Sequence, residues 1–471
     1  MKENRGKGGR KQEGKRGSGK KELAAHLKRV NLNAAGIDIG SERHYVAVPA
    51  GRDEKSVRNF GCLTPDLHEM AKWLKSCGIE TVAMESTGVY WIPVAHILDQ
   101  YGFEVKLVNA KHVKNVPGRK TDVQDCQWLQ ELHTFGLLSG AFLPDRSIEM
   151  LRVYWRHRAG LVASCARQIH LMQKSLEQMN IQLHKVISDI TGVTGMRIIR
   201  AILGGERDAV SLAQMKHPYV KSSEETIAKA LMGDYREDHL FTLRQAVELY
   251  DVYQGKIADS DRQIENYMLS AFETKANSED IKKQIPLKGG RSRRKNNPYF
   301  DLKAMLYRIT GVDLTKIDGI DAMTAHTIIT ECGFDMSRFP TEKHFASFLC
   351  LCPNNRITGG KVIKRGTQKS NNRAAKALRI AAQSLHHSAS ALGAFYRRMR
   401  MRLGAPKAIT ATARKLAILV YRMLKHGEEY VDKGQDYYEK QYEERVLNNL
   451  KKRAKSIGCN LVHMETGEVV S

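Results

Sequence analysis

The chain has 471 residues, which corresponds to about three domains of roughly 150 residues each. Its 76 Lys and Arg residues outnumber its 51 Asp and Glu residues, giving a formal net charge of +25, so nucleic acid is the first partner to consider. The sequence has no apolar run of about eighteen residues and no recognisable signal peptide, so we expect a cytoplasmic protein. Its eight cysteines form no CxxC pair, which argues against a zinc ribbon or a disulfide framework.

The first 30 residues are rich in Gly, Lys and Arg. This composition contains too few large apolar groups to offset the entropy of ordering the chain. We therefore expect residues 1–30 to form a disordered basic tail that contacts phosphates without sequence preference.

Between residues 31 and 147 the apolar pattern alternates between strand and helix periods. Two short strands around a polar turn are predicted in "AAGIDIGSERHYVAVPAG", a strand ending at Glu85 in "ETVAMES", and another strand in "FEVKLVN". Helices are predicted in "VYWIPVAHILDQYG" and "TDVQDCQWLQELHTFG". Alternating strands and helices predict an α/β domain in which helices cover a sheet.

Residues 148–284 show helical spacing of apolar residues over two long segments that flank a shorter insert. This pattern is typical of a coiled-coil arm that dimerises, and a helical bundle within one chain explains it equally well. Residues 285–300 form a basic linker with Arg291, Arg293 and Arg294, which either contacts nucleic acid or is simply solvated.

The C-terminal region, residues 301–432, is expected to be mostly helical, so the whole chain is an α/β domain plus all-α regions. Its Gly-Ile-Asp turn at 319–321 resembles a helix-hairpin-helix, and residues 191–205 echo it weakly. An ordinary turn between helices is an equally good interpretation. After Gly359 and Gly360 follows a basic loop with Lys361, Lys364, Arg365, Lys369 and Arg373. We expect residues 433–471 to form a charged, irregular tail.

Two acids open the predicted helix that follows residue 120. Thr121 and Gln124 have the spacing of a capping box, which places Asp122 and Asp125 in the first turn. Side chains three residues apart share one helix face, with β-carbons about 5–6 Å apart. Two carboxylates this close repel each other unless a cation lies between them. Ordinary first-turn acids, which the helix dipole favours, are the alternative interpretation.

Two further acids fall at strand ends. Asp38 lies between Ile37 and Ile39 in the first strand, and Glu85 ends another strand. Because strand ends of an open α/β sheet meet at one edge, Asp38, Glu85, Asp122 and Asp125 are candidates for a two-metal site with Mg²⁺ or Mn²⁺ that acts on phosphodiesters. A turn-capping acid and a helix N-terminal acid are the alternatives for Asp38 and Glu85. The adjacent basic pair, Arg119 and Lys120, is a candidate for nucleic-acid contact.

Four stretches resemble the DEDD-type insertion-sequence transposases, also called RNA-guided bridge recombinases: "GIDIGSERHYVAV", "AMESTGVYWIPVAHIL", "VNAKHVKNVPGRKTDVQDCQWL" and "FASFLCLCPNNRITGGK". The similarity runs from about residue 34 to 431. It implies a RuvC-like, ribonuclease H-fold catalytic domain, a coiled-coil dimerisation region and a smaller C-terminal transposase domain. It also implies that Asp38, Glu85, Asp122 and Asp125 bind the metal.

The same resemblance implies a serine nucleophile five residues after a proline and directly before a glycine. Here the position after Pro353 and before Gly359 holds Thr358, whose hydroxyl could also attack phosphorus. Ser347 and Ser370 are the alternatives. The resemblance further implies a noncoding guide RNA that pairs with donor and target DNA, a homodimer that assembles into a tetramer, and a location at the prokaryotic nucleoid.

Three other functions compete with this hypothesis. "GIDIGS" also resembles the first phosphate loop of actin-like ATPases and sugar kinases, but no second glycine-rich phosphate loop follows in a strand context. A Holliday-junction-type, metal-dependent DNA endonuclease would cut without a covalent intermediate. A catalytically idle nucleic-acid-binding protein is disfavoured because all four acids are present.

Overall fold

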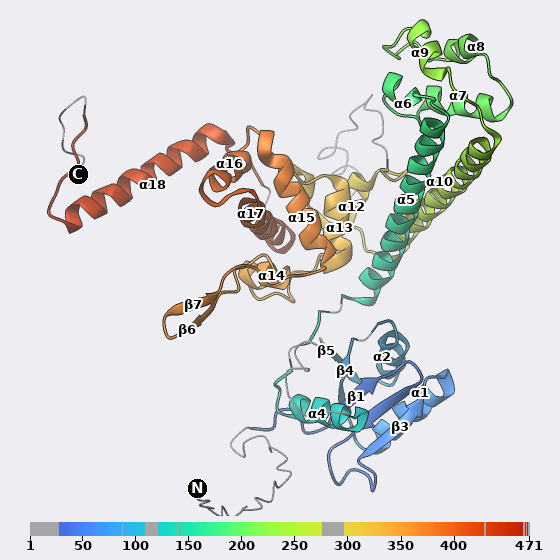
Figure 1. The fold of residues 1–471 in the computed structure, drawn as a ribbon. Helices are drawn as coiled ribbons and strands as arrows, with labels where there is room; N and C mark the ends of the chain where they lie inside the picture. The colour runs from blue at the N-terminus through green and yellow to red at the C-terminus, as the bar shows by residue number, and fades with distance from the viewer. Residues whose placement is uncertain are drawn as a thin grey trace, which may run out of the picture. The chain divides into compact units, whose positions relative to one another are not determined.

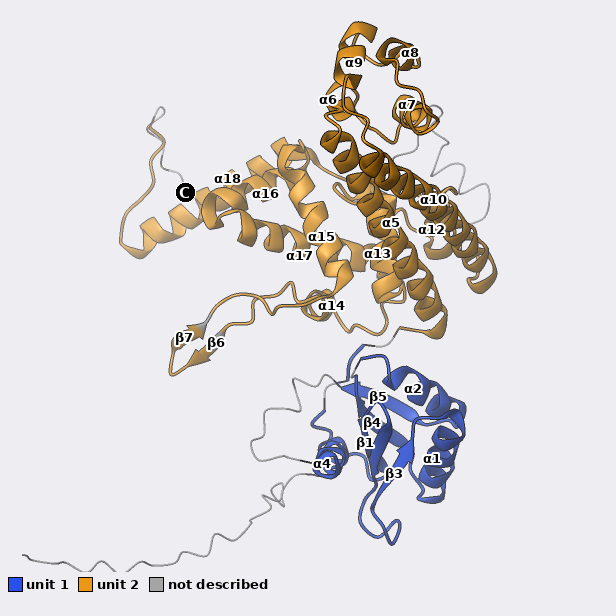
Figure 2. Cartoon of the chain, turned by 45° about the vertical axis from the view of Figure 1, so that its right-hand side comes forward, with its two compact units in different colours: residues 1–143 blue, residues 144–471 orange. Residues whose placement is uncertain are grey.

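The computed structural model describes residues 28–86, 88–108, 121–138, 140–142, 144–275, 296–427, 430–464, 467 and 469. The chain divides into two compact units, residues 1–143 and residues 144–471 (Figure 2). Unit 1 is α/β and unit 2 is almost entirely helical, so the predicted fold class is confirmed at this level. The predicted tail of residues 1–30 falls almost wholly outside the described residues.

Unit 1 is built on a five-stranded mixed sheet with the order β3-β2-β1-β4-β5 (Figure 1). The strands are β1 (Ala34–Ile39), β2 (Arg43–Ala47), β3 (Val57–Gly61), β4 (Thr81–Glu85) and β5 (Glu104–Val108). The first three form an antiparallel meander, whereas β4 is parallel to both β1 and β5. The carboxyl ends of β1, β4 and β5 therefore lie at one edge of the sheet.

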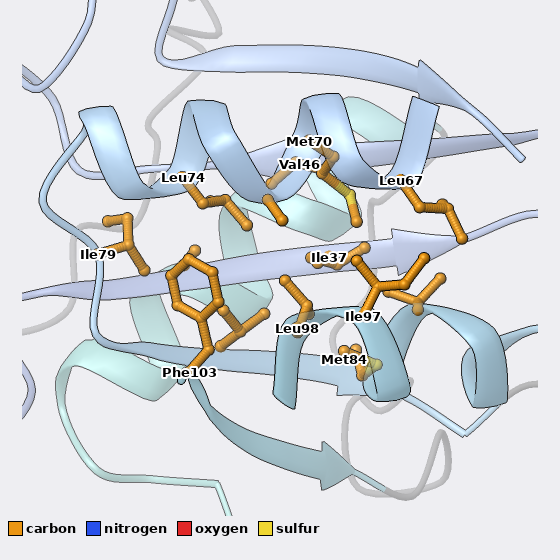
Figure 3. Close-up of a cluster of buried hydrophobic side chains, with 14 of the residues drawn as sticks. Ile37, Val46, Leu67, Met70, Leu74, Ile79, Met84, Ile97, Leu98 and Phe103 are labelled. Atoms are coloured by element: carbon orange, nitrogen blue, oxygen red, sulfur yellow. The ribbon is translucent and has the colours of Figure 1, made fainter. Parts of the chain in front are cut away.

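Helices cover both faces of this sheet. Helices α1 (Thr64–Ser76) and α2 (Trp91–Gln100) pack on one face over buried Ile37 and Met84, as Figure 3 shows. Helix α4 (Asp122–Thr134) packs on the opposite face, where Leu129 joins a small cluster of buried residues. Because strand side chains alternate between faces, each strand contributes to both layers.

Two elements of unit 1 were not among the expected ones, β3 and α1. Strand β3 is an edge strand with an exposed polar pair, Arg58 and Asn59, so its sequence lacks an apolar alternation. Helix α1 does carry the usual signals, because Pro65 stands at its start and its buried residues recur at helical spacing.

Unit 2 begins with a long antiparallel helix pair, α5 (Arg146–Gln178) and α10 (Glu237–Ala271). At one end of the pair Tyr267 donates to the backbone oxygen of Ser147, and at the other Ser175 and Thr242 share a hydrogen bond of 3.0 Å. The apolar stripes therefore meet within one chain, and dimerisation through this region stays a prediction. No helix in the described part of the chain is long and apolar enough to cross a membrane.

Four short helices join the far ends of this pair (Figure 1). They are α6 (Leu183–Val186), α7 (Val193–Leu203), α8 (Ala209–Gln214) and α9 (Glu224–Leu231). Their buried residues, such as Ile198, Leu212 and Ile227, form one core with the ends of α5 and α10. We call residues 183–231 the helical tip and the α5–α10 pair the arm.

The rest of unit 2 is a helical assembly with one small hairpin. Its elements are α12 (Leu302–Thr310), η1 (Leu314–Lys316), α13 (Ala322–Cys332), α14 (Glu342–Phe348), β6 (Arg356–Thr358), β7 (Lys361–Lys364), α15 (Arg373–Ser384), η2 (Leu385–His387), α16 (Ala391–Leu403), α17 (Ala405–His426) and α18 (Gly434–Ser456). The expectation that residues 433–471 form an irregular tail is wrong at α18, which is a 23-residue helix. Good helix formers fill it, and the Arg398 guanidinium lies 3.1 Å from the centre of the Tyr442 ring, although α18 has no buried residue.

Helix α13 holds the base of the arm. Arg152 donates to the last-turn backbone oxygens of Thr330 and Glu331 at 3.0 and 2.8 Å, and Arg156 pairs with the Glu331 carboxylate at 2.6 Å. The Trp155 ring meets the fully buried His326 ring edge-on at 4.2 Å between centroids. We call these contacts between α5 and α13 the arm joint.

Candidate active site

The first turn of α4 carries two of the candidate acids. Thr121 is its N-cap, and the Thr121 hydroxyl accepts a hydrogen bond from the Gln124 backbone N–H at 3.4 Å. Asp122 is exposed and Asp125 is half-buried, both within this first turn. The predicted helix start is therefore confirmed, and the two carboxylates lie at the positive end of the helix dipole.

Helix α4 crosses the sheet in the direction opposite to β1 and β4. A β-carbon on Gly36 would overlap the backbone of Cys126 and Gln130, so the middle of α4 lies directly on β1. At the end of α4, the ring nitrogen Nε2 of His133 and the Thr81 hydroxyl, at the start of β4, are 2.9 Å apart. The first turn of α4 therefore lies toward the carboxyl ends of β1 and β4.

Asp38 and Glu85 lie on the α4 face of the sheet at those same ends. Ile37 and Ile39, which flank Asp38, are 0% and 4% exposed and join the core on the opposite face, as expected. The parallel register pairs Ile37 with Met84, so Asp38 and Glu85 are the next neighbours along the two strands. Glu85 is 8% exposed and Asp38 is half-buried.

The thiol of Cys126 reports the electrostatic field on this face. Burial, together with the charges of Asp38 and Asp125, raises the pKa of Cys126 to about 12. The thiol donates to the backbone oxygen of Val123 at 3.2 Å. A strand acid and a helix acid thus both act on one buried sulfur, which indicates that the negative charges of β1 and α4 are concentrated in the same region.

The fit of a metal to these acids is mixed. Carboxylate oxygens are suitable ligands for Mg²⁺ or Mn²⁺, and the backbone brings four of them to one end of one sheet face. Within the described residues, however, no three His, Cys, Asp or Glu side chains are grouped so that they could hold a metal ion. The donor chemistry therefore fits a divalent cation, whereas the side-chain positions do not form a complete ligand set.

An open cavity of about 610 Å³ lies along the β2–β3 hairpin and reaches α4, and none of the four acids lines it. Its walls include Tyr45, the cross-strand partner of Asp38, and Val123, which stands between Asp122 and Asp125. The sequence interpretation did not single out Tyr45, Cys126 or Gly36. Of these, only Gly36 had a signal, because a glycine inside a buried strand often marks close approach of another backbone.

Thr358 is on a different unit, in the β6–β7 hairpin. Gly359 and Gly360 form the two-residue turn of the hairpin, with φ of +54° and +75°, and Thr358 pairs with Lys361 across it. Positive φ at both turn positions is typical of a type I′ turn and favours glycine. The Thr358 side chain is exposed.

The alternative hydroxyls differ in exposure and contacts. Ser347 is exposed on α14, whereas Ser370 is half-buried and its hydroxyl accepts a hydrogen bond from the Asn372 N–H at 3.1 Å. Of the candidate basic residues, Lys361, Arg365, Lys369 and Arg373 are exposed, and Lys364 lies on β7. The remaining candidates, Arg119, Lys120, Arg291, Arg293 and Arg294, lie outside the described residues.

The turn at 319–321 caps a helix rather than presenting a bare cradle for phosphate. Asp321 is the N-cap of α13 and accepts a hydrogen bond from the Thr324 N–H at 2.8 Å. A β-carbon on Gly319 would come within 2.7 Å of the Ala381 backbone oxygen, so the turn lies against α15. Burial and the charge of Asp432 raise the pKa of Asp318. These acids favour the interpretation of an ordinary turn between helices.

Comparisons with known proteins agree with the resemblance. Residues 35–181 match the DEDD family model of IS110 transposases, described as "Transposase", and residues 313–397 match the model described as "Transposase IS116/IS110/IS902 family". A search of curated proteins gave no match. The first match covers the candidate acids and the second covers Thr358, in the expected order. The chain therefore belongs to the IS110 family of insertion-sequence transposases, enzymes that cut and rejoin DNA.

Proposed function

We propose that this transposase transfers DNA strands through attack of the Thr358 hydroxyl on a DNA phosphate, with Asp38, Glu85, Asp122 and Asp125 stabilising the reaction. The observation that carries the proposal is the convergence of acids from β1, β4 and α4 at one end of one sheet face. The sheet topology brings any strand-end groups to this edge, so the support lies in all four of these groups being carboxylates.

The proposed reaction conserves the free energy of the phosphodiester bond. A bond forms between Thr358 Oγ1 and phosphorus, one P–O bond to a deoxyribose oxygen breaks, and the threonine proton passes to that leaving oxygen, directly or through water. Attack by a second DNA hydroxyl on the covalent phosphothreonine reverses these steps and releases Thr358. Because each bond broken is replaced by an equivalent bond, no nucleotide cofactor is required.

The end of the sheet face where Asp38, Glu85, Asp122 and Asp125 lie is called the acid face. These four acids are proposed to hold divalent metal, Mg²⁺ or Mn²⁺, once DNA occupies it. When bound there, the cation would supply positive charge to the phosphate oxygens and lower the pKa of the attacking hydroxyl. The protein's own contribution is to fix the carboxylates on two strands and one helix. Exposed Thr358 then contributes the nucleophilic oxygen.

We propose donor and target double-stranded DNA as substrates, together with a structured noncoding guide RNA. Support comes from the net charge of +25 and from the exposed lysines and arginines that follow Thr358. The proposed active assembly is a homodimer that forms a tetramer when two DNAs are joined.

A metal-dependent endonuclease without a covalent intermediate is the second candidate. One observation favours it: the acids and Thr358 lie on different compact units, so the acid face has all of its carboxylates without unit 2. In that case water rather than Thr358 would attack the phosphate.

A strand-exchange assay separates these two functions. Purified protein is incubated with Mg²⁺, the flanking noncoding RNA and labelled donor and target DNA, and products are resolved under denaturing conditions with and without protease. The variants are Thr358→Val, which keeps the shape and removes the hydroxyl, Thr358→Ser, which keeps the hydroxyl, and Asp122→Asn.

Our proposal predicts a protease-sensitive DNA adduct in the wild type and in Thr358→Ser, and none in Thr358→Val or Asp122→Asn. Cleavage that needs Asp122 but proceeds in Thr358→Val without an adduct would establish the endonuclease instead. Omission of the RNA tests guidance separately, because unguided exchange would overturn only that part of the proposal.

A further inference from the structure

The helical tip lies in a part of the chain that neither family match covers, between residues 181 and 313. It contains a cavity of about 760 Å³ formed by the α6–α7 turn and the loop between α8 and α9. This volume is within the range of pockets that enclose small-molecule-sized groups, about 300–1,000 Å³. The strand-transfer reaction proposed above uses no residue of this cavity.

Hydrogen bonds hold the two walls of the cavity together. The His217 N–H donates to the Thr194 hydroxyl at 2.9 Å, and the Ser222 hydroxyl donates to the Val186 backbone oxygen at 2.7 Å. Lys216 Nζ donates to the Ser222 backbone oxygen at 3.0 Å. Because the first two of these bonds bridge segments more than 20 residues apart, the cavity is part of the folded tip and does not require a ligand to form.

Exposed cations and an aromatic pair line this cavity. Lys185 from α6 and Lys221 from the α8–α9 loop stand on opposite walls and are both exposed. Tyr219 is 90% exposed, and its ring lies 5.1 Å from the His217 ring at an angle of 39°. A tyrosine ring left almost fully in water beside two lysines is the arrangement that binds a nucleic-acid base and its phosphates.

The acid in the lining does not oppose this interpretation. The Asp189 carboxylate accepts hydrogen bonds from the Thr191 N–H and hydroxyl at 2.9 and 2.7 Å, so it is directed at its own turn. The exposed Val193 opens α7 at the edge of the cavity, and the positive end of the α7 helix dipole adds positive potential there.

We propose that the helical tip binds single-stranded nucleic acid, with an unpaired base stacked on Tyr219 and flanking phosphates on Lys185 and Lys221. An unpaired strand fits better than a duplex, because bases within a duplex are stacked on each other and are not free to stack on the exposed Tyr219 ring. RNA and single-stranded DNA share this chemistry, so the test compares both.

Photo-crosslinking of the full chain tests the site directly. A mixed-sequence oligonucleotide with one thiouridine, its DNA counterpart with one thiothymidine, and a DNA duplex with the same thiothymidine are each irradiated with the protein, and adducts are mapped by mass spectrometry. We expect at least one of the two single strands to label the peptide that contains residues 217–221. The duplex should label this peptide on the order of tenfold less.

Variants test the roles of the ring and the charges. Tyr219→Ala should reduce this adduct on the order of tenfold, and Tyr219→Trp should retain it because stacking is preserved. Lys185→Glu with Lys221→Glu should reduce the slope of log affinity against log salt by about 1.4, or about 0.7 for each lost phosphate contact. The matched control is Lys174→Glu with Lys229→Glu, which makes the same charge change on exposed lysines outside the cavity lining.

The proposal is overturned if all adducts map outside the helical tip, if the duplex labels it as well as the single strands do, or if the two double variants behave alike. Melting temperatures of all variants show whether the tip remains folded. If the lysine variants unfold it, the comparison of Tyr219→Ala with Tyr219→Trp still tests the site. Because the measured quantity is an adduct at the tip, Asp122→Asn should leave it unchanged. Failure of this site is therefore distinguishable from failure of the proposed strand transfer.

Discussion

The acid face of unit 1 and the β6–β7 hairpin of unit 2 carry their candidate catalytic groups in opposite ways. Asp38 is fixed between two core residues on a strand against which α4 packs without space for a side chain at Gly36. Thr358 instead stands beside a two-glycine turn, on a hairpin where Ile357 and Ile363 are 62% and 70% exposed.

This difference separates a part that sets geometry from a part that can adapt. Side chains on packed strands and helices keep their positions, which suits the binding of charge in a reaction. A short hairpin with few buried contacts opens and bends at low cost, which suits a nucleophile that must follow a phosphate.

Loss of an acid should abolish the chemistry without harming the fold. Asp122→Asn should reduce strand cleavage by a factor of about 10³ or more, because it removes a charge needed at the phosphate, equivalent to about 4 kcal/mol of barrier. Gel-based cleavage assays measure this. The control is Glu104→Gln, at the amino end of β5, and equal losses in both variants would contradict a role specific to the acid end of the sheet.

A side chain at position 36 should destabilise unit 1 itself. Gly36→Val should lower the free energy of unfolding of unit 1 by about 3 kcal/mol, the upper end of the cost of overpacking, because α4 must move away from β1. Chemical denaturation followed by circular dichroism measures it. Gly160→Ala, in α5 where the β-carbon meets no neighbour, should instead stabilise the arm by about 0.5–1 kcal/mol.

Unit 2 also contains a rigidly buried group, His326 of the arm joint. Acid pH should lower the stability of the arm joint because of this residue. Burial and the charge of Arg158 lower the pKa of His326 to about 3, and neither of its ring nitrogens has a hydrogen-bond partner among the described residues. Since unfolded His binds a proton below about pH 6.5 and folded His326 does not until about pH 3, stability is lost as pH falls between those values.

From pH 7.5 to 4.5 this single histidine should cost about 3 kcal/mol, and His326→Phe should remove that part of the loss. Phenylalanine keeps an aromatic ring against Trp155 without a titratable nitrogen. Denaturation curves at the two pH values give the difference. An identical pH dependence in both proteins would mean that His326 is hydrated or paired in solution.

Strain in the hairpin should remain local. Gly360→Ala forces a side chain at φ of +75° and should cost about 1 kcal/mol within the hairpin. Hydrogen exchange should become faster in residues 356–364, whereas the melting temperature of unit 2 should stay the same. A lowered melting temperature would show that the hairpin is part of the folded core and would remove the contrast with the acid face.

Sequence patterns predicted the part of the site that depends on periodicity. Alternation placed Asp38 opposite Ile37 and Ile39, and the capping pattern placed Asp122 and Asp125 in one turn, because both depend only on neighbouring residues. The direction of α4 across the sheet could not be predicted in this way, since it depends on contacts of Gly36 and Thr81 with residues about 50 to 95 positions away.

The same reason explains what was missed in unit 2. The helical tip was seen only as an insert, because its cavity is made by hydrogen bonds between segments that have no common pattern. Helix α18 was missed because its charged surface gives no apolar stripe, although its residues favour helix individually. Long-range packing determined the cavity, whereas local helix propensity without an apolar stripe accounts for α18.

The arm joint has a mechanical consequence. Helix α5 has 33 residues and is therefore about 50 Å long, so a tilt of about 5° at its base displaces the far end by roughly 4 Å. The arginines of α5 bond directly to the last turn of α13, and α13 packs on α12 and α15. The arm would therefore tilt about its contacts with α13. A nucleic-acid strand that pulled on the helical tip would exert torque on the helices of the C-terminal region.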